Sequence, residues 1–532
     1  MSVTAPTEEI EAIIARTALK YDLLPYQSKA FAQSQPARLG AIAQLFGLDV
    51  APLATARVLE LGCASGGNII PHALRYPDAT FVGVDLARTQ VAAGRSRIAR
   101  LGLTNVEIRC QSFTEIGDEL GSFDYIICHG VYSWVPAAVQ DAIFKIIRAR
   151  LSPVGIACIS YNVLPGWRML QPLRDAFLLE VPDHIDSLGR VARARELLTF
   201  LSSATPDTGP YGNMLRIWAE RLSTLPDDYL AHEFLEEMNH PSTVRDFAAN
   251  ASHNGLGFLA ECELASMILE NYGAEVAQQV RARSGNDLVG SEQYLDLLSG
   301  RTFRQTLLIA NERMPTVNRA LRPESIDRLH FLTQAGMNLD RDGDKYLITD
   351  VCGRTLSTDS SAVAEGLARL FERFPSSSSL DDCAGAIPEE EREAGRGLLL
   401  DALYRMTLVG MVTLSSEPIH AGSVGEYPKA IALARTDASD GGQSTTNIRH
   451  ETIAIDPATR AILPAMDGTL DHVALARLLE GEALSGRLSF SRDGNIVTDE
   501  VSLRDIAQEH IPTLLARMAS AGLLEDNINL II

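Results

Sequence analysis

The sequence is poor in cysteine, in aromatic side chains and in positive charge. Its 532 residues include 7 cysteines and 3 tryptophans, and aromatic residues make up 6% of the chain. The cysteines form no CxxC pair and are odd in number, which argues against a disulfide framework and against a zinc site. Lys and Arg total 47 against 68 Asp and Glu, so the formal net charge is −21. This excess of acid argues against a nucleic acid as the main partner.

Long apolar runs are also missing. No window contains the roughly 20 consecutive apolar residues that a membrane span requires. The start of the chain, residues 1–9, lacks the basic and apolar regions of a signal peptide. We therefore expect a cytoplasmic protein without a membrane span. The chain is too long for one hydrophobic core, so we expect roughly two to four domains.

From residue 57 onward, short apolar runs alternate with helical segments. The pattern predicts strands at 58–61, 80–85, 106–109, 123–128, 155–161, 257–262 and 302–309. Helical segments near 87–101 and 136–151 separate the earlier strands, and helical insertions precede and separate the last two. This rhythm predicts an α/β fold with a doubly wound, Rossmann-like parallel sheet.

The two ends of the chain have a different, mainly helical character. Residues 1–50 contain helical patterns at 8–19 and 36–46, and we expect them to form a lid on the sheet domain, 51–310. Beyond residue 315, two helix–loop–helix segments, 361–414 and 463–526, end in the same phrase, L-x-R-M-x-x-x-G, which begins at Leu403 and at Leu515. We predict two related, winged-helix-like domains over 315–420 and 421–532.

A glycine-rich turn follows the first predicted strand, in the stretch ELGCASGGN at 60–68. Glycine lets the backbone turn sharply and approach a ligand, here at the carboxyl edge of the sheet where ligands bind. Asp85 ends the second predicted strand, where a carboxylate can accept hydrogen bonds from ribose hydroxyls. Ala64 replaces the middle glycine of the dinucleotide fingerprint, and Glu60 precedes Gly62 by two positions as in methyltransferases. The turn therefore favours S-adenosylmethionine over a dinucleotide.

Five phrases occur together in this chain: YDLLPY at 21–26, the turn at 60–68, HGVYSWVP at 129–136, SYNVLPGW at 160–167 and FRQTLL at 303–308. In this combination the chain resembles bacterial class I methyltransferases that carry a methyltransferase regulatory domain. That group includes rickettsial protein-lysine methyltransferases acting on outer-membrane proteins. The resemblance implies S-adenosylmethionine as cofactor, a helical middle or regulatory region at about 168–300, and C-terminal domains that contribute to substrate binding.

The resemblance and the turn together predict the cofactor-binding residues. They are Tyr21, Tyr26, Ser28, Glu60, Gly62, Cys63, Ala64, Gly66, Asn68, Asp85, Leu86, Ser112, Phe113 and His129. Ser112 stands where many relatives place an Asp that accepts the adenine amino group, so the adenine contact at this edge departs from the family pattern.

Four residues after the fourth and fifth strands are candidates for the methyl-transfer site: His129, Trp134, Tyr161 and Asn162. Methyl transfer mainly requires that a lone pair be placed behind the methyl group, and aromatic faces stabilise the cations involved. His129 is open to two roles, as a general base or as a hydrogen-bond donor to the cofactor. Trp134 is equally compatible with core packing. His232 and His240 lack metal-ligand spacing, so we predict no metal and treat both as structural or surface residues.

The leading prediction is N-methylation of lysine side chains on a protein substrate. Two alternatives remain open. In the first, the protein is an enzyme that methylates a small molecule or a peptide natural product, and its C-terminal domains serve to form a homodimer. In the other alternative the protein binds S-adenosylmethionine in a regulatory role without turnover.

Overall fold

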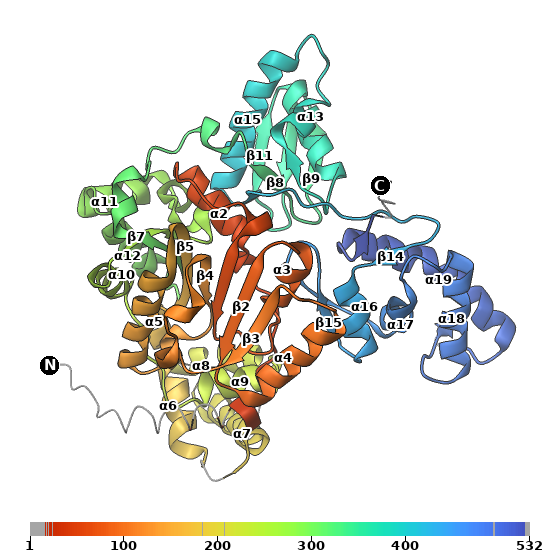
Figure 1. Cartoon of the computed structure of the whole chain (residues 1–532), viewed down its shortest axis with the longest axis horizontal. Helices are drawn as coiled ribbons and strands as arrows, with labels where there is room; N and C mark the ends of the chain where they lie inside the picture. Colours follow the sequence, from red (N-terminus) through yellow and green to blue (C-terminus); the bar gives the residue numbers. More distant parts are fainter. Residues whose placement is uncertain are drawn as a thin grey trace.

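The computed structural model describes residues 16, 19, 21–23 and 25–526, except 183, 184, 207, 493 and 494. Most of the helix predicted over 8–19 therefore lies outside the described residues. Figure 1 shows a central sheet with helices on both faces, a bundle of helices at its lower end, and two C-terminal units above it and beside it. Within the described part of the chain, none of the helices combines the length and the apolar character that a membrane crossing needs.

The central sheet has seven strands in the order β3-β2-β1-β4-β5-β7-β6. Strands β1 to β5 are parallel, and β7 runs antiparallel to both β5 and β6. The order reverses between β1 and β4, which makes their carboxyl ends the switch point of the sheet. The predicted doubly wound sheet is confirmed. The strands are β1 (Arg57–Leu61), β2 (Thr80–Asp85), β3 (Val106–Cys110), β4 (Phe123–Cys128), β5 (Leu151–Asn162), β6 (Leu256–Glu261) and β7 (Phe303–Ala310).

Each face of the sheet has its own hydrophobic core. On one face, apolar side chains of the strands pack against α2 (Pro36–Leu45), α3 (Ile70–Arg75) and α4 (Arg88–Arg100). On the other face they pack against α5 (Ala137–Arg150) and α10 (Val244–His253). Two further helices, α11 (Ala274–Ser284) and α12 (Leu288–Ser299), lie between β6 and β7 in the chain. The alternation of side chains along a strand decides which core each residue joins.

The middle helices form a separate core. They are α6 (Gln171–Glu180), α7 (Ser187–Ala204), α8 (Pro210–Ser223) and α9 (Asp227–Phe234). Their buried side chains include Phe177 and Phe234, and Trp167, from the short helical turn before α6, joins the same core. Figure 1 shows these helices at the lower end of the sheet. A bridge between Val163 and Ser242 ties this region to the carboxyl end of β5.

The first C-terminal unit shares the core of the sheet domain. Its helices α13 (Ser361–Glu372), α14 (Leu380–Ala384) and α15 (Arg392–Leu408) accompany a small sheet of β12 (Ser378–Ser379), β8 (His330–Leu332) and β13 (Thr413–Ser415). Buried residues of this unit join the same cluster as α2 and the strands. This unit is therefore packed as an extension of one face of the central sheet.

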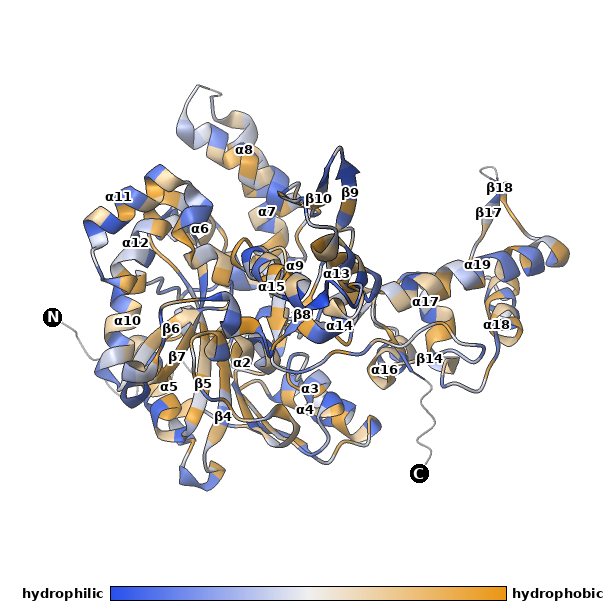
Figure 2. Cartoon of the chain, turned by 90° about the horizontal axis from the view of Figure 1, so that it is seen from above, coloured by the Kyte–Doolittle hydropathy of each residue, from blue (hydrophilic) through white to orange (hydrophobic). Residues whose placement is uncertain are grey.

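The second C-terminal unit has a core of its own. It contains α16 (Ala432–Ser439), α17 (Pro457–Ile462), α18 (His472–Leu484) and α19 (Glu500–Ser520). Figure 2 shows α18 and α19 standing apart from the sheet domain. Apolar side chains of both helices, among them Leu479 and Leu515, belong to this core. The domain boundaries at 50, 310 and 420 stay predictions.

The repeated phrase marks the same local structure in both C-terminal units. It ends α15 and α19 with a glycine at positive φ, Gly410 at 77° and Gly522 at 67°. In both, the next amide donates back to the methionine carbonyl of the phrase, at 2.9 Å in the first unit and 3.0 Å in the second. A left-handed glycine after a helix closes the last turn in this way, so the glycine of the motif is required by the backbone.

Candidate functional site

Backbone conformation and close packing both require glycine at two positions of the turn after β1. Gly62 and Gly66 have φ of 77° and 78°. A Cβ atom at Gly62 would lie 2.3 Å from Cγ2 of Val131, and one at Gly66 would lie 2.8 Å from Ile108 and Ile70 side-chain atoms. The amides of Gly62 and Cys63 both donate to the carbonyl of Val84, at 2.8 and 3.2 Å. The turn is thereby held against the end of β2.

Asp85 lies at the end of β2 with its carboxylate directed at this turn. Oδ2 accepts a hydrogen bond from the Ala64 amide at 2.8 Å, and Oδ1 accepts one from the Ala87 amide at 2.9 Å. Burial raises the pKa of Asp85, while these backbone hydrogen bonds act to lower it. Each carboxylate oxygen has a second lone pair, so Asp85 retains one acceptor site on each oxygen for a pair of ribose hydroxyls.

Glu60 and Asn68 form a buried pair beneath the turn. Glu60 Oε1 accepts a hydrogen bond from Asn68 Nδ2 at 2.8 Å. Glu60 Oε2 is buried and has no hydrogen-bond partner among the described residues. Burial raises the pKa of Glu60 to about 8. A buried carboxylate oxygen without a partner is costly, and it fits the ammonium group of S-adenosylmethionine.

The N-terminal segment lies across the turn. Asp22 Oδ1 accepts hydrogen bonds from the amide and the hydroxyl of Thr89, at 2.9 and 2.7 Å. Ser28 Oγ accepts one from the Gly67 amide at 2.7 Å. A Cβ atom at Gly67 would lie 2.4 Å from the carbonyl carbon of Ser28, so this glycine makes room for the segment. These contacts hold Asp22 and Ser28 against the turn and α4, while the lid expected over residues 1–50 stays a prediction.

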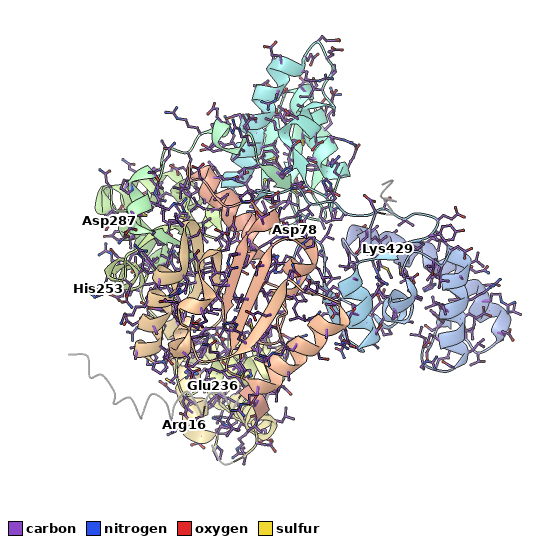
Figure 3. The ribbon with its side chains drawn as sticks, in the orientation of Figure 1. Arg16, Asp78, Glu236, His253, Asp287 and Lys429 are labelled. Carbon is purple, nitrogen blue, oxygen red and sulfur yellow. The ribbon has the colours of Figure 1, made fainter. Side chains whose placement is uncertain are left out.

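Tyr21 and Tyr26 meet His232 of α9, which the sequence analysis treats as a structural or surface residue. The ring of His232 is stacked on Tyr21 at 4.7 Å between centroids and meets Tyr26 edge-on at 5.7 Å. Glu236 Oε1 lies 3.5 Å from Nδ1 of His232. Burial, followed by the charges of Glu236 and Asp85, raises the pKa of Tyr21. Figure 3 labels Glu236 at the lower end of the sheet.

His129 follows β4 in mainly apolar surroundings. Its ring lies 3.8 Å from the ring of Phe31, and Nδ1 lies 3.4 Å from Nε2 of Gln305. Burial, followed by the charge of Lys29, lowers the pKa of His129 to about 4. The ring is therefore neutral at pH 7. It can donate one hydrogen bond, and its low basicity argues against a role as the base.

Trp134 packs against the middle helices. Its ring meets Trp167 edge-on at 6.1 Å, and the Arg174 guanidinium lies 5.9 Å from the ring centre. The side chain is only partly buried, so one part of the ring joins the core of the middle helices and the rest is exposed. Its predicted place in the methyl-transfer site stays a prediction.

Tyr161 and Asn162 are adjacent in β5 and point to opposite faces of the sheet. Tyr161 stacks on Phe247 of α10 at 3.9 Å, and its hydroxyl lies 3.3 Å from Oγ1 of Thr306. The Asn162 amide donates to Ser133 Oγ at 2.8 Å, while its side-chain Nδ2 is buried without a partner among the described residues. The structure thus separates the predicted pair, with Tyr161 in the core and Asn162 holding an unused donor.

Asn239 is a residue that the sequence interpretation missed. Both polar atoms of its side chain are buried without a partner among the described residues. The next residue, His240, donates its amide to the carbonyl of Ser133 at 2.7 Å, beside the group that holds Asn162. No local pattern marks Asn239, because only the folding of the middle region onto the end of β5 brings it there.

Leu86 follows β2, and Ser112 and Phe113 follow β3, at the same carboxyl edge of the sheet. The Ser112 hydroxyl accepts a hydrogen bond from the Thr114 amide at 3.3 Å, and Glu115 Oε2 accepts one from the Ser112 amide at 3.1 Å. Ser112 therefore caps a short helical turn that begins at the buried Phe113. The Leu86 carbonyl lies 3.7 Å from Cys110 Sγ. In the described part of the chain, no group of three or more His, Cys, Asp or Glu side chains is placed to hold a metal ion.

Three family models match separate parts of the chain. A methyltransferase domain matches residues 58–155, a "predicted methyltransferase regulatory domain" matches 226–310, and a "PKMT, C-terminal winged helix domain" matches 426–523. The chain is also 32% identical over 519 residues to the uncharacterised protein RP789 of Rickettsia prowazekii, covering 95% of this chain and 93% of that protein. The chain belongs to the bacterial class I methyltransferases that carry a methyltransferase regulatory domain.

Solved structures resemble this methyltransferase over nearly its whole length. The structure of PKMT2 from Rickettsia typhi has a TM-score of 0.83 and 28% identity, and it covers 94% of this chain and 100% of that chain. The structure of PKMT2 in complex with AdoHcy has a TM-score of 0.82 and 29% identity over the same shares. The methyltransferase uses S-adenosylmethionine, as its methyltransferase domain implies, and the turn, Asp85 and Glu60 fit that cofactor.

Proposed function

We propose that this methyltransferase transfers methyl groups to the side-chain amines of lysine residues in a protein substrate. One observation carries the proposal: the rings of Tyr21 and Tyr26 meet His232 of α9, and the Glu236 carboxylate lies 3.5 Å from Nδ1 of that histidine. The charge of Glu236 acts on Tyr21, and the charge of Glu233 acts on both Tyr21 and Tyr26. The Rickettsia typhi structures that resemble this chain are of PKMT2, a protein lysine methyltransferase by name, which supports the same acceptor class.

The charges of Glu233, in α9, and of Glu236, just beyond its end, suit a cationic side chain. Burial raises the pKa of Glu233 to about 7, and the nearby Arg174 acts in the opposite direction. An ammonium group that entered beside Glu233 and Glu236 would stabilise their ionised forms. The faces of Tyr21 and Tyr26 would stabilise the same charge. An acceptor without a positive charge would leave these carboxylates with less compensation.

The chain's own residues then orient the acceptor. S-adenosylmethionine supplies a methyl group that its sulfonium centre makes electrophilic. A lysine amine has a reference pKa of about 10.4 and attacks only in its neutral form, so it must first pass its proton to water or to a nearby carboxylate such as Glu233, whose pKa is raised to about 7. Asn239 Oδ1 offers a buried acceptor for an N–H of the amine, which can hold it in line. The buried donors, Nδ2 of Asn239 and Nδ2 of Asn162, can bond oxygen atoms of the substrate backbone and leave the attacking lone pair free. The enzyme's contribution is mainly this placement.

The test is transfer of radiolabelled methyl from S-adenosylmethionine into a lysate of the source bacterium, separated into protein and small-molecule fractions. We expect label in protein bands, mapped to lysine by mass spectrometry. Glu236→Gln should lower the transfer on the order of tenfold, since it removes one charge facing the acceptor. Glu275→Gln, an exposed residue of α11, is the matched control and should retain full activity.

Other outcomes would favour the other functions. Label confined to the small-molecule fraction would replace the proposal with methylation of a small molecule or peptide. Absence of label in every fraction, together with tight binding of S-adenosylhomocysteine, would favour a regulatory protein that does not turn over.

A further inference from the structure

A loop of the second C-terminal unit reaches the cofactor site of the sheet domain. The loop connects β15 (Ser444–Thr446) to β16 (Thr452–Ala454). Asn447 shapes it, because its Oδ1 accepts the amides of Arg449 and Glu451, both at 2.9 Å. Asn447 Nδ2 donates to the carbonyl of Ala521 at 2.9 Å, which fixes the loop to the end of α19. Figure 1 shows β15 beside α4 and α3.

The loop is anchored to both neighbouring parts of the protein. Arg75 of α3 donates to the carbonyl of Ile448 at 2.8 Å and to the carbonyl of Pro418 at 2.8 Å. Arg449 donates to the carbonyl of Thr333 at 2.7 Å. Salt bridges from Arg97 of α4 to Asp437 of α16 support the same contact. The tip of the loop is therefore held in one position against the sheet domain.

His450, at the tip, is inserted between residues of the cofactor site. It is 2% exposed, and its ring is stacked on His72 of α3 at 3.8 Å. Nε2 lies 2.8 Å from Oδ1 of Asn68. The backbone of His450 has a φ of 63°, a conformation that non-glycine residues rarely adopt and that carries a cost. The surrounding contacts hold His450 in this conformation.

The other hydrogen bonds of Asn68 show which atom is the donor in its contact with His450. The Phe31 amide donates to Asn68 Oδ1 at 2.9 Å, and Asn68 Nδ2 donates to Glu60 Oε1 at 2.8 Å. Oδ1 is thus the acceptor, and Nε2 of His450 must carry the proton. Burial lowers the pKa of His450 to about 3, so the ring is neutral and this is its single N–H. His450 and Phe31 together fix the amide that holds Glu60.

We propose that His450 is a positioning residue of the cofactor site, supplied by the C-terminal winged-helix unit and acting through Asn68 on Glu60. The unpaired Oε2 of Glu60 is the atom available to the cofactor's ammonium group. When His450 holds the Asn68 amide, the Glu60 carboxylate is fixed before the cofactor arrives, and less ordering is left for the binding step. The second C-terminal unit therefore sets cofactor affinity, which is independent of which acceptor is methylated.

Two amide variants separate positioning from simple packing. Glutamine at 450 places an N–H near the position of Nε2, whereas asparagine is one methylene shorter and tolerates positive φ better. We expect His450→Asn to weaken binding of S-adenosylhomocysteine about tenfold by calorimetry, and His450→Gln to stay within about threefold of the unaltered protein. In steady-state kinetics, His450→Asn should raise KM for S-adenosylmethionine and leave kcat at saturation nearly unchanged.

Thermal unfolding without ligand provides the comparison. If His450 only packs, the asparagine variant, which relieves backbone strain, should unfold at the same temperature as the glutamine variant or higher. It should also bind S-adenosylhomocysteine at least as tightly. His510→Leu, an exposed histidine of α19, is the matched control and should bind S-adenosylhomocysteine with unaltered affinity. Equal binding by the asparagine and glutamine variants, whether retained or lost, would overturn the proposal.

Discussion

At the scale of single residues, the site is built from buried polar side chains whose hydrogen bonds are incomplete. Glu60 Oε2, Asn162 Nδ2 and both polar atoms of Asn239 are buried without partners among the described residues. Each such group costs about 1–3 kcal/mol when it is left unsatisfied. All of these residues lie at or beside the carboxyl ends of β1 and β5, where the cofactor and the acceptor have to meet. We therefore infer that the cofactor and the acceptor supply the hydrogen bonds that these atoms lack.

Asp85→Ala should weaken binding of S-adenosylhomocysteine on the order of 100-fold, because two charge-assisted hydrogen bonds are lost. Isothermal titration calorimetry measures the change directly. Asp78→Ala, in the exposed turn before β2, is the control and should bind normally. Unchanged affinity of the Asp85 variant would remove the assignment of this carboxylate to the ribose.

Glu60 predicts a pH dependence of cofactor binding. Burial raises its pKa to about 8, so the side chain is mostly protonated at pH 6 and ionises as the pH approaches 8. The ionised form attracts the cofactor's ammonium group, so affinity for S-adenosylhomocysteine should rise between pH 6 and 7.5, by at most about tenfold per unit. Calorimetry across this range should give a flat profile for Glu60→Gln. A flat profile for the unaltered protein would contradict the assignment.

Asn162 and Tyr161 should respond differently to truncation. Asn162→Ala removes the unpaired donor and should lower kcat on the order of tenfold, with nearly unchanged cofactor affinity. Tyr161→Phe removes a hydroxyl that contacts Thr306 inside the core, so turnover should change less than about twofold while stability falls by about 1 kcal/mol. Steady-state kinetics and thermal unfolding of both variants provide the comparison. A larger loss of kcat in the Tyr161 variant would return the catalytic role to that residue.

At the scale of elements, a buried charge cluster connects β7 to the helical insertion before it. Arg304 is 1% exposed and lies 2.8 Å from Oε1 of Glu261 in β6. It also lies 3.0 Å from Glu292 and 2.8 Å from Asp296, both of α12. The cluster joins α12 to β6 and β7, and it explains how an arginine can be buried within β7.

Arg304→Met should destabilise the protein by about 3–5 kcal/mol, because three buried carboxylates lose the cation that bridges them, although Arg301 still lies near Glu292 and Asp296. Arg245→Met provides a matched control. Its exposed guanidinium lies 3.9 Å from Asp287, which Figure 3 labels, and its loss should cost less than about 1 kcal/mol. Chemical denaturation of both variants measures the two effects, and equal losses would show that the cluster contributes little.

At the scale of the whole molecule, the two C-terminal units are joined to the sheet domain in different ways. The first shares a continuous core with α2 and the strands, so a cut at residue 315 would expose apolar surface of the sheet domain. The second has a separate core and touches the sheet domain through polar contacts of Arg75, Arg97 and His450. Only the second unit is therefore a candidate for removal without unfolding the rest.

Deletion of residues 421–532 should leave a folded protein with weaker cofactor affinity. The three remaining cores are intact, while the contact of His450 with Asn68 is lost. We expect the affinity for S-adenosylhomocysteine to fall about tenfold or more, as in His450→Asn. Circular dichroism checks the fold and calorimetry the affinity. Full affinity of the folded, shortened chain would contradict the role of the second unit.

The sequence by itself determined the sheet and the cofactor edge. Strand and helix periodicities are local signals, and they placed all seven strands, although β5 begins four residues earlier than predicted (151 against 155). Gly62, Asp85 and Glu60 are also readable locally, because each stands at a set distance from the end of a strand. The glycines of the repeated C-terminal phrase follow the same rule.

Only the tertiary structure decided which distant side chains complete the site. His450 and Asn68 are 382 residues apart in the chain, and His232 and Asn239 reach the edge only when the middle helices fold onto it. The alternation of β5 separated Tyr161 from Asn162, and the choice of face depends on how the whole sheet packs. Local patterns carry information about backbone geometry, whereas contacts between distant segments depend on the packing of complete units, which no short stretch of sequence encodes.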